Sequence, residues 1–95
     1  MIKHIVMWRL KEDRKEDRKK VEQILEGLKD KIEEIKTIEV GINFNPSEAA
    51  YDIVLYSEFE NKEGLDRYQK HPEHLKVAEF IRQVVEERAV VDYTN

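Results

Sequence analysis

The sequence predicts an α+β domain in which four strands and two helical regions follow one another in the order β-α-β-β-α-β. Three observations predict this order. Segments with alternating apolar residues lie near both ends of the chain and twice in its middle. One apolar stripe with helical spacing follows the first of these segments. Two helix-start signals, Asn61 and His71-Pro72, precede the last of them.

The first strand is expected over residues 2–10. It carries apolar residues on both faces, which predicts a central strand covered on both sides, and His4 shares a face with Val6 and Trp8. The next ten residues, KEDRKEDRKK, repeat a four-residue unit and predict the first turns of a solvated helix. Asp13 and Glu16 have the spacing of a capping box. The apolar stripe then continues this helix to Glu34 or Ile35, through Val21, Ile24, Leu25, Leu28, Ile32 and Ile35.

The middle of the chain predicts an antiparallel hairpin. Residues 37–44 form a short strand in which Gly41 marks a bulge or a close approach of two backbones. The sequence Asn45-Pro46-Ser47-Glu48 is typical of a turn. Residues 50–59 then alternate again and form the second strand of the hairpin.

The last third predicts two short helices and a strand. Asn61 is expected to cap a helix that reaches Tyr68 or Gln69, and His71 a helix that begins at Pro72. The second of these helices is apolar around much of its girth as far as Val85, which predicts burial on more than one side. A final strand covers residues 88–93.

This order is that of the ferredoxin-like fold, with one four-stranded antiparallel sheet in a single domain over residues 1–95. Helices on one face of the sheet leave the other face needing a partner. Two such sheets packed face to face predict a homodimer, a dimeric α/β barrel.

Composition excludes several functions. The charge of −4 comes from interspersed residues of both signs, so no nucleic-acid partner is expected. Because the chain has no cysteine, it has no disulfide, no thiolate metal site and no cysteine nucleophile. No apolar run reaches the roughly 18 residues that would span a bilayer, so no membrane partner is expected. We expect a cytoplasmic protein.

The candidate catalytic residues are Tyr68, His74, His4 and Asp92. An imidazole can take a proton near neutral pH, and a buried phenol can hold a developing negative oxygen. Asp92 is expected to hold the ring of either His74 or His4 in one tautomer. All four side chains can instead be structural, with both imidazoles and the phenol bonded inside the protein. A metal site needs a third ligand beside His71 and His74, from Glu73 or Asp92, and no metal is expected.

Four landmarks match a known family in order and spacing: Ile2-Lys3-His4-Ile5-Val6, Tyr51-Asp52 with Ser57-Glu58-Phe59, Tyr68-x-x-His71-Pro72-x-His74, and Val90-Val91-Asp92-Tyr93. Over essentially its whole length the chain resembles the Dabb family of stress-responsive dimeric α/β-barrel proteins.

The resemblance implies a function as well as a fold. It extends to a plant cyclase that makes olivetolic acid by an aldol closure without metal or cofactor, and it implies that Tyr68 and His74 carry the catalysis. It also implies that His4 and Asp92 belong to the same pocket. We therefore expect a cofactor-independent cyclase or lyase for a small carbonyl compound. The alternatives are a non-catalytic stress-related dimer that binds a small apolar ligand, and a cofactor-free monooxygenase-like enzyme for phenolic or aromatic ligands.

Overall fold

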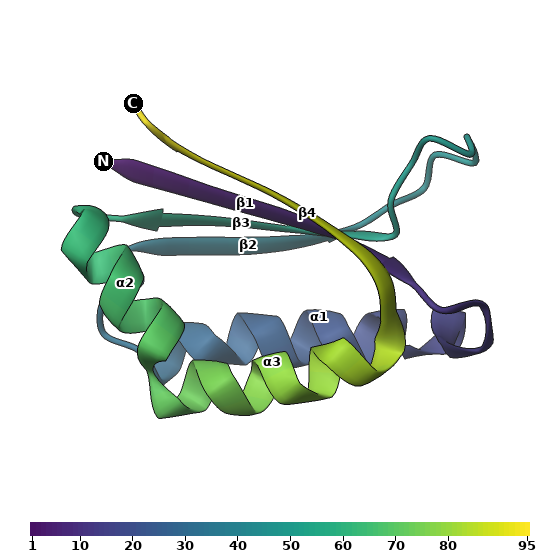
Figure 1. The fold of residues 1–95 in the computed structure, drawn as a ribbon, viewed down its shortest axis with the longest axis horizontal. Coiled ribbons are helices and arrows are strands. Elements are labelled where there is room, and N and C mark those ends of the chain that lie inside the picture. Colours follow the sequence, from purple (N-terminus) through teal and green to yellow (C-terminus); the bar gives the residue numbers. More distant parts are fainter.

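A computed structural model describes residues 1–95 and contains the predicted order of strands and helical regions (Figure 1). Its elements are β1 (Ile2–Leu10), the 3-10 helix η1 (Glu12–Asp17), α1 (Arg18–Glu26), the 3-10 helix η2 (Gly27–Asp30), β2 (Thr37–Ile42), β3 (Ile53–Phe59), α2 (Lys62–Lys70), α3 (Pro72–Val84) and β4 (Val85–Thr94).

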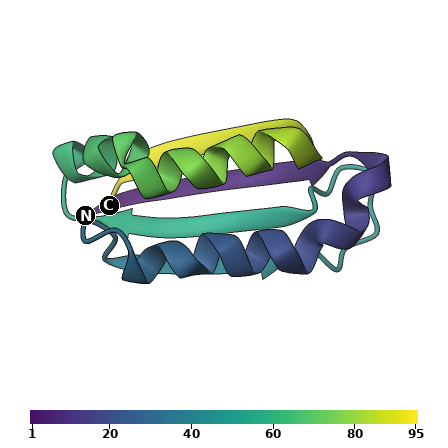
Figure 2. The same ribbon diagram turned by 90° about the horizontal axis from the view of Figure 1, so that it is seen from below.

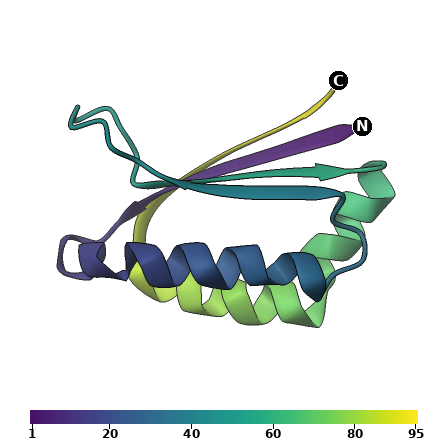
Figure 3. The ribbon, with the colours of Figure 1, turned by 180° about the vertical axis from the view of Figure 1, so that it is seen from behind.

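The strands form one antiparallel sheet in the order β2-β3-β1-β4. The ferredoxin-like α+β fold predicted from the sequence is therefore confirmed. All helices lie against the same face of this sheet, and the opposite face carries none (Figures 1 and 3). Seen from the helical side, α1 runs along β2 and β3, and α3 runs along β1 and β4 (Figure 2).

The core lies between the helices and the inner face of the sheet. Alternate residues of β1 and β3 point into it, including Val6, Leu10, Leu55 and Phe59, which are all buried. From the other layer, the stripe of the first helical region meets them. Its members Val21, Leu25, Leu28, Ile32 and Ile35 are buried, and Ile24 is half-buried.

The first helical region is less regular than the periodicity predicts. It begins as a 3-10 turn and ends as another at Asp30, so Ile32 and Ile35 reach the core from irregular chain. The expected capping box does not form, because no side chain caps η1 or α1. Long-range bonds hold this turn instead: the Lys11 N–H donates to the Val84 carbonyl at 2.9 Å, and Lys15 reaches Asp52.

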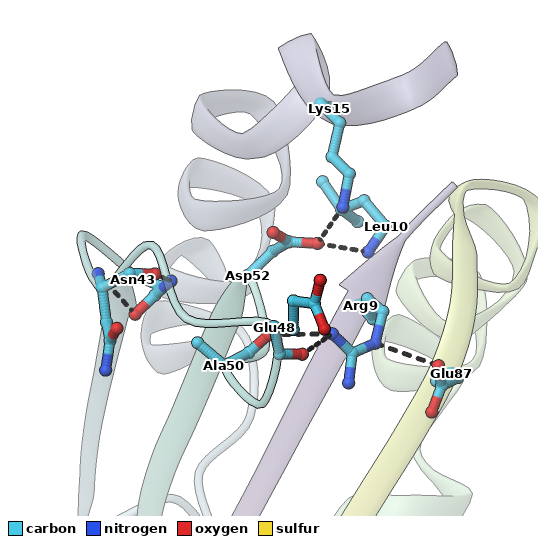
Figure 4. A network of polar contacts seen from close by, with 9 residues as sticks. Arg9, Leu10, Lys15, Asn43, Glu48, Ala50, Asp52 and Glu87 are labelled. Carbon is cyan, nitrogen blue, oxygen red and sulfur yellow. Dashed lines mark hydrogen bonds and ion pairs between the residues drawn. The ribbon is translucent and has the colours of Figure 1, made fainter. Parts of the chain in front are cut away.

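Asp52 joins β1 to the start of the helical layer (Figure 4). One of its carboxylate oxygens accepts from the Leu10 N–H and from the Lys15 ammonium, each at 2.7 Å. Nearby, Arg9 donates to the carbonyl of Ala50 at 2.9 Å and to Glu87 of β4 at 2.9 Å. These bonds fix the β2–β3 connection to β1, and β3 becomes regular only at Ile53 rather than at the predicted Ala50.

Two predicted helix caps are confirmed. Asn61 accepts from the Gly64 N–H at 2.8 Å at the start of α2, and His71 accepts from the Glu73 N–H at 3.1 Å at the start of α3. Gly41 sits at a close approach rather than a bulge, since a Cβ there would lie 3.2 Å from Val54 and the β2–β3 register is unbroken.

The prediction that α3 is buried on more than one side is wrong for the single chain. Ile81 and Val84 are buried, but Leu75 is 53% exposed. The buried face of α3 packs against the core and against α1 and α2, with Val77 and Phe80 half-buried, and the opposite face is open. It also ends earlier than expected, because Val85 already begins β4.

Candidate functional site

A cavity of about 360 Å³ lies between the inner face of the sheet and the helices. Its volume falls in the range of small-molecule pockets in proteins. Most of its walls are apolar or aromatic, from residues of β1, β3, α1, α2, α3 and β4. The remaining wall residues are His4, Gln69, His74, Arg82 and Arg88.

Tyr68 lines this cavity from the last turns of α2. Its side chain is fully buried, and its hydroxyl has no hydrogen-bond partner. The ring packs between Phe59, at a centroid distance of 4.8 Å, and His74, at 4.6 Å. Burial raises the pKa of Tyr68 to about 12, against a smaller opposing effect of the Arg88 charge. The phenol is therefore protonated at neutral pH and has a proton to donate.

His74 lies in the first turn of α3, three residues after the cap His71. Its Nδ1 atom is 3.1 Å from the carbonyl oxygen of Gln69. Because a carbonyl only accepts, Nδ1 carries the hydrogen, and Nε2 of the neutral ring keeps a lone pair. Burial lowers the pKa of His74 below its usual 6.5. The positive fields of His4 and Arg88 act in the same direction, and the Gln69 bond opposes them. His74 is therefore a neutral imidazole at neutral pH.

His4 is held by Asp92. The two residues face each other in the β1–β4 ladder, and the Nδ1 atom of His4 lies 2.5 Å from a carboxylate oxygen of Asp92. The His4 side chain is 3% exposed, and its ring centroid is 6.1 Å from that of Tyr68. Asp92 was expected to hold either His74 or His4, and in the structure it holds His4. The expectation that Asp92 holds His74 is wrong, because the Nδ1 atom of His74 binds the Gln69 carbonyl instead.

The structure brings His4, Tyr68 and His74 to one cavity, and Asp92 reaches it through His4. His71 serves as a helix cap outside it. No three His, Asp or Glu side chains converge as a metal site would require.

Sequence reasoning missed Gln69, Arg82 and Arg88. The alternation of β4 was the available signal for Arg88, since Arg88 and Asp92 fall on the same face of one strand.

The fold and this cavity define a ferredoxin-like α+β protein with two histidines and a tyrosine between sheet and helices. The profile of the stress-responsive A/B barrel domain, Dabb, matches residues 2–95. The chain therefore belongs to the Dabb family, as its landmarks predicted.

Individual relatives agree with this assignment. A stress-response A/B barrel domain-containing protein of Arabidopsis thaliana is 26% identical in an alignment 98 residues long. The alignment covers 96% of this chain and 83% of that protein. Among solved structures, a dimeric protein of unknown function with a ferredoxin-like fold from Bacteroides fragilis is 37% identical. It has a TM-score of 0.89 over 99% of this chain and 95% of its own.

The hydroxynitrile lyase of Passiflora edulis shares the fold with a TM-score of 0.87, over 99% of this chain and 93% of its own. At 20% identity, this likeness concerns the fold alone.

None of the helices is both long and apolar enough for a membrane span. The cytoplasmic location stays a prediction.

Proposed function

We propose that the cavity is the active site of a cofactor-independent lyase or cyclase that acts on a small, partly apolar carbonyl compound. The observation that carries the proposal is the buried, unpartnered hydroxyl of Tyr68 beside the neutral imidazole of His74. An unsatisfied buried hydroxyl costs about 1–3 kcal/mol, a cost that a bound ligand oxygen would remove.

His74 is the base in this proposal. Its Nδ1–H is bound by Gln69, which leaves the Nε2 lone pair free to take a carbon-bound proton next to the substrate carbonyl. Since its pKa lies below 6.5, the imidazole stays in its basic form throughout the neutral range.

Tyr68 is the hydrogen-bond donor. When the carbon–hydrogen pair of electrons moves into the new carbon–carbon double bond, negative charge develops on the carbonyl oxygen, and the Tyr68 hydroxyl stabilises it. In a closure, the enolate carbon then attacks a second carbonyl carbon, and the alkoxide that forms takes the proton from His74. In the reverse direction, His74 takes the hydroxyl proton, the carbon–carbon bond breaks, and the proton passes from His74 to the enolate carbon. Both directions balance without an oxidant, a metal or a cofactor.

His4 is a positioning residue. Asp92 fixes its ring by the short bond to Nδ1, so its Nε2 edge has a defined orientation in the same cavity. A second fixed polar group gives a small carbonyl compound one preferred orientation relative to Tyr68 and His74.

Deuterium uptake tests the proposal without knowledge of the natural substrate. The probe is 4-phenyl-2-butanone in D2O, and NMR follows the loss of protons next to the carbonyl. We expect wild-type protein to accelerate exchange above buffer, and Tyr68→Phe and His74→Gln each to lower the protein-dependent rate by about a hundredfold.

His71→Asn is the matched control. It removes a neighbouring imidazole outside the cavity and keeps a residue that can cap α3. It should exchange at the wild-type rate. Wild-type exchange no faster than buffer, or equal rates in wild type and His74→Gln, would overturn the proposed chemistry. Binding of the ketone without exchange would favour the non-catalytic ligand-binding dimer.

We also propose that the chain forms a homodimer through the open face of its sheet. This face exposes apolar residues on neighbouring strands, including Met7, Val91 and Tyr93, with exposed fractions of 37%, 53% and 43%. Phe44, in the β2–β3 connection, is 97% exposed. The Bacteroides fragilis relative is described as dimeric. Sedimentation should give the mass of a dimer for wild type and of a monomer for Met7→Glu combined with Val91→Glu; the mass of a monomer for wild type would overturn this assembly.

A further inference from the structure

Two guanidinium groups line the cavity, and no carboxylate does. Arg82 comes from α3 and forms an ion pair with Glu79 at 2.6 Å. Arg88 comes from β4 and has no ion pair within 4.0 Å, although the chain as a whole carries a charge of −4. The cavity wall thus carries the unpaired positive charge of Arg88 in an acidic protein, and such a charge attracts anions.

The sheet register fixes the place of Arg88. It pairs with Trp8 of β1, four residues along β4 from the Asp92–His4 pair. At about 3.3 Å per residue, the two pairs are separated by about 13 Å along the sheet. Both side chains belong to the inner face, so Arg88 lies at the other end of the same strand face from His4.

The charge of Arg88 reaches the proposed reacting groups. Burial is the largest influence on both groups: it raises the pKa of Tyr68 and lowers the pKa of His74. The charge of Arg88 has a smaller, downward effect on each of the two pKa values. Arg88 lines the same cavity as Tyr68 and His74, so one small molecule in that cavity can touch all three side chains. Arg82 and Arg88 are both wall residues of that one cavity.

We propose that the natural ligand is a carboxylic acid: a small, partly apolar carbonyl compound whose carboxylate is bound by Arg88. This inference rests on the proposed function, because it assumes that the carbonyl group lies at Tyr68 and His74. The planar guanidinium matches a carboxylate with two parallel hydrogen bonds. The apolar walls, which include Val6, Leu55 and Ile81, hold the intervening carbon skeleton.

The test compares 4-oxo-4-phenylbutanoate with its primary amide, which has the same shape and no charge. Dissociation constants are measured by ¹H–¹⁵N NMR titration of wild type, Arg88→Gln, Arg88→Lys and Arg67→Gln. Arg67→Gln removes the same charge at a surface site, where Arg67 pairs with Glu34, and so controls for net charge. Arg88 is exposed in the strand, so its substitution leaves the core intact.

We expect wild type to bind the acid about tenfold to a hundredfold more tightly than the amide, as for a hydrogen bond to a charged group. The ratio should fall to near one in Arg88→Gln, keep an intermediate value in Arg88→Lys and be unchanged in Arg67→Gln. Equal binding of acid and amide by wild type would overturn the inference. So would an acid preference that survives in Arg88→Gln, or failure of the acid to shift the cavity signals.

Failure of this inference can be told apart from failure of the proposed function. The ketone 4-phenyl-2-butanone has no carboxylate, so its deuterium exchange depends on Tyr68 and His74 and not on the arginine. Exchange together with equal binding of acid and amide would overturn the proposed carboxylate site and support the proposed carbonyl site. A preference for the acid without any exchange would retain an acid-binding cavity and remove the chemistry.

Discussion

His4 and Asp92 are separated by 88 positions in the chain, yet their side chains are joined by a 2.5 Å contact across the β1–β4 ladder. The imidazole is buried, whereas the Asp92 side chain is 41% exposed. The pair therefore connects the edge of the sheet to the cavity, and it ties the last strand to the first at the end where both chain termini lie (Figure 1).

Removal of the Asp92 carboxylate should destabilise the fold. Asp92→Ala leaves the buried Nδ1–H of His4 without its acceptor, and we expect a loss of about 1–2 kcal/mol in the free energy of unfolding by urea. Glu87→Ala is the control on the same strand. Because the Arg9–Glu87 pair is exposed, its loss should cost less than about 0.5 kcal/mol. Equal losses of unfolding free energy in the two variants would mean that the His4–Asp92 bond stabilises the fold no more than an exposed ion pair does.

Tyr68→Phe should leave the protein as stable as wild type, or stabilise it by up to about 1 kcal/mol, because it removes a buried hydroxyl that has no partner. The same variant should lose deuterium exchange. Tyr56→Phe makes the same chemical change where the hydroxyl does donate, to Glu58, and should lower stability. Thermal unfolding of both variants beside wild type measures the contrast, and a marked loss of stability in Tyr68→Phe would show that its hydroxyl is satisfied in solution.

His74 should make stability depend on pH just below neutrality. Burial lowers its pKa in the folded state, so between pH 6.5 and that lower value the unfolded chain binds more protons. The contribution of His74 to the free energy of unfolding is complete above pH 6.5 and is lost as pH falls from 6.5 to the lower pKa of the folded state. The difference in unfolding free energy between wild type and His74→Gln should therefore be constant above pH 7 and shrink below 6.5. A difference that grows as pH falls would mean that the folded state favours the charged ring.

The sequence predicts those structural features of this protein that depend on residues close together in the chain. The alternation in β1 and β3 and the caps Asn61 and His71 are local signals, and the structure confirms them. The 3-10 turn before α1 was missed because Lys11 and Lys15 are held by Val84 and Asp52, which are distant in the chain.

The same limit applies to the cavity. The residue types marked His4, Tyr68 and His74 as candidates, but sequence alone left the partner of each imidazole open. Asp92 is opposite His4 only through the β1–β4 register, and Gln69 reaches His74 only because the chain turns at His71. Arg88 carried no local signal beyond its strand face, so its place in the cavity required the fold.

Asp52 should be the strongest polar anchor of the β1 end. Asp52→Asn removes the charge that accepts from the Leu10 N–H and from Lys15, and we expect a loss of about 1–2 kcal/mol at pH 7 in urea unfolding. Burial alone would raise the pKa of Asp52, but the Lys15 ammonium and the Leu10 N–H outweigh it and hold the pKa below 3.8.

Because that pKa is lowered on folding, the contribution is complete above the unfolded value near 3.8 and disappears as pH falls through the folded value. Wild type and Asp52→Asn should therefore differ by a constant amount down to about pH 5 and converge below it. Lys15→Met separates the two bonds, since it leaves the Leu10 N–H satisfied, and it should cost less than Asp52→Asn. If Lys15→Met costs as much as Asp52→Asn, the charge of Asp52 stabilises the turn through the ion pair with Lys15 and not through the bond to the Leu10 N–H.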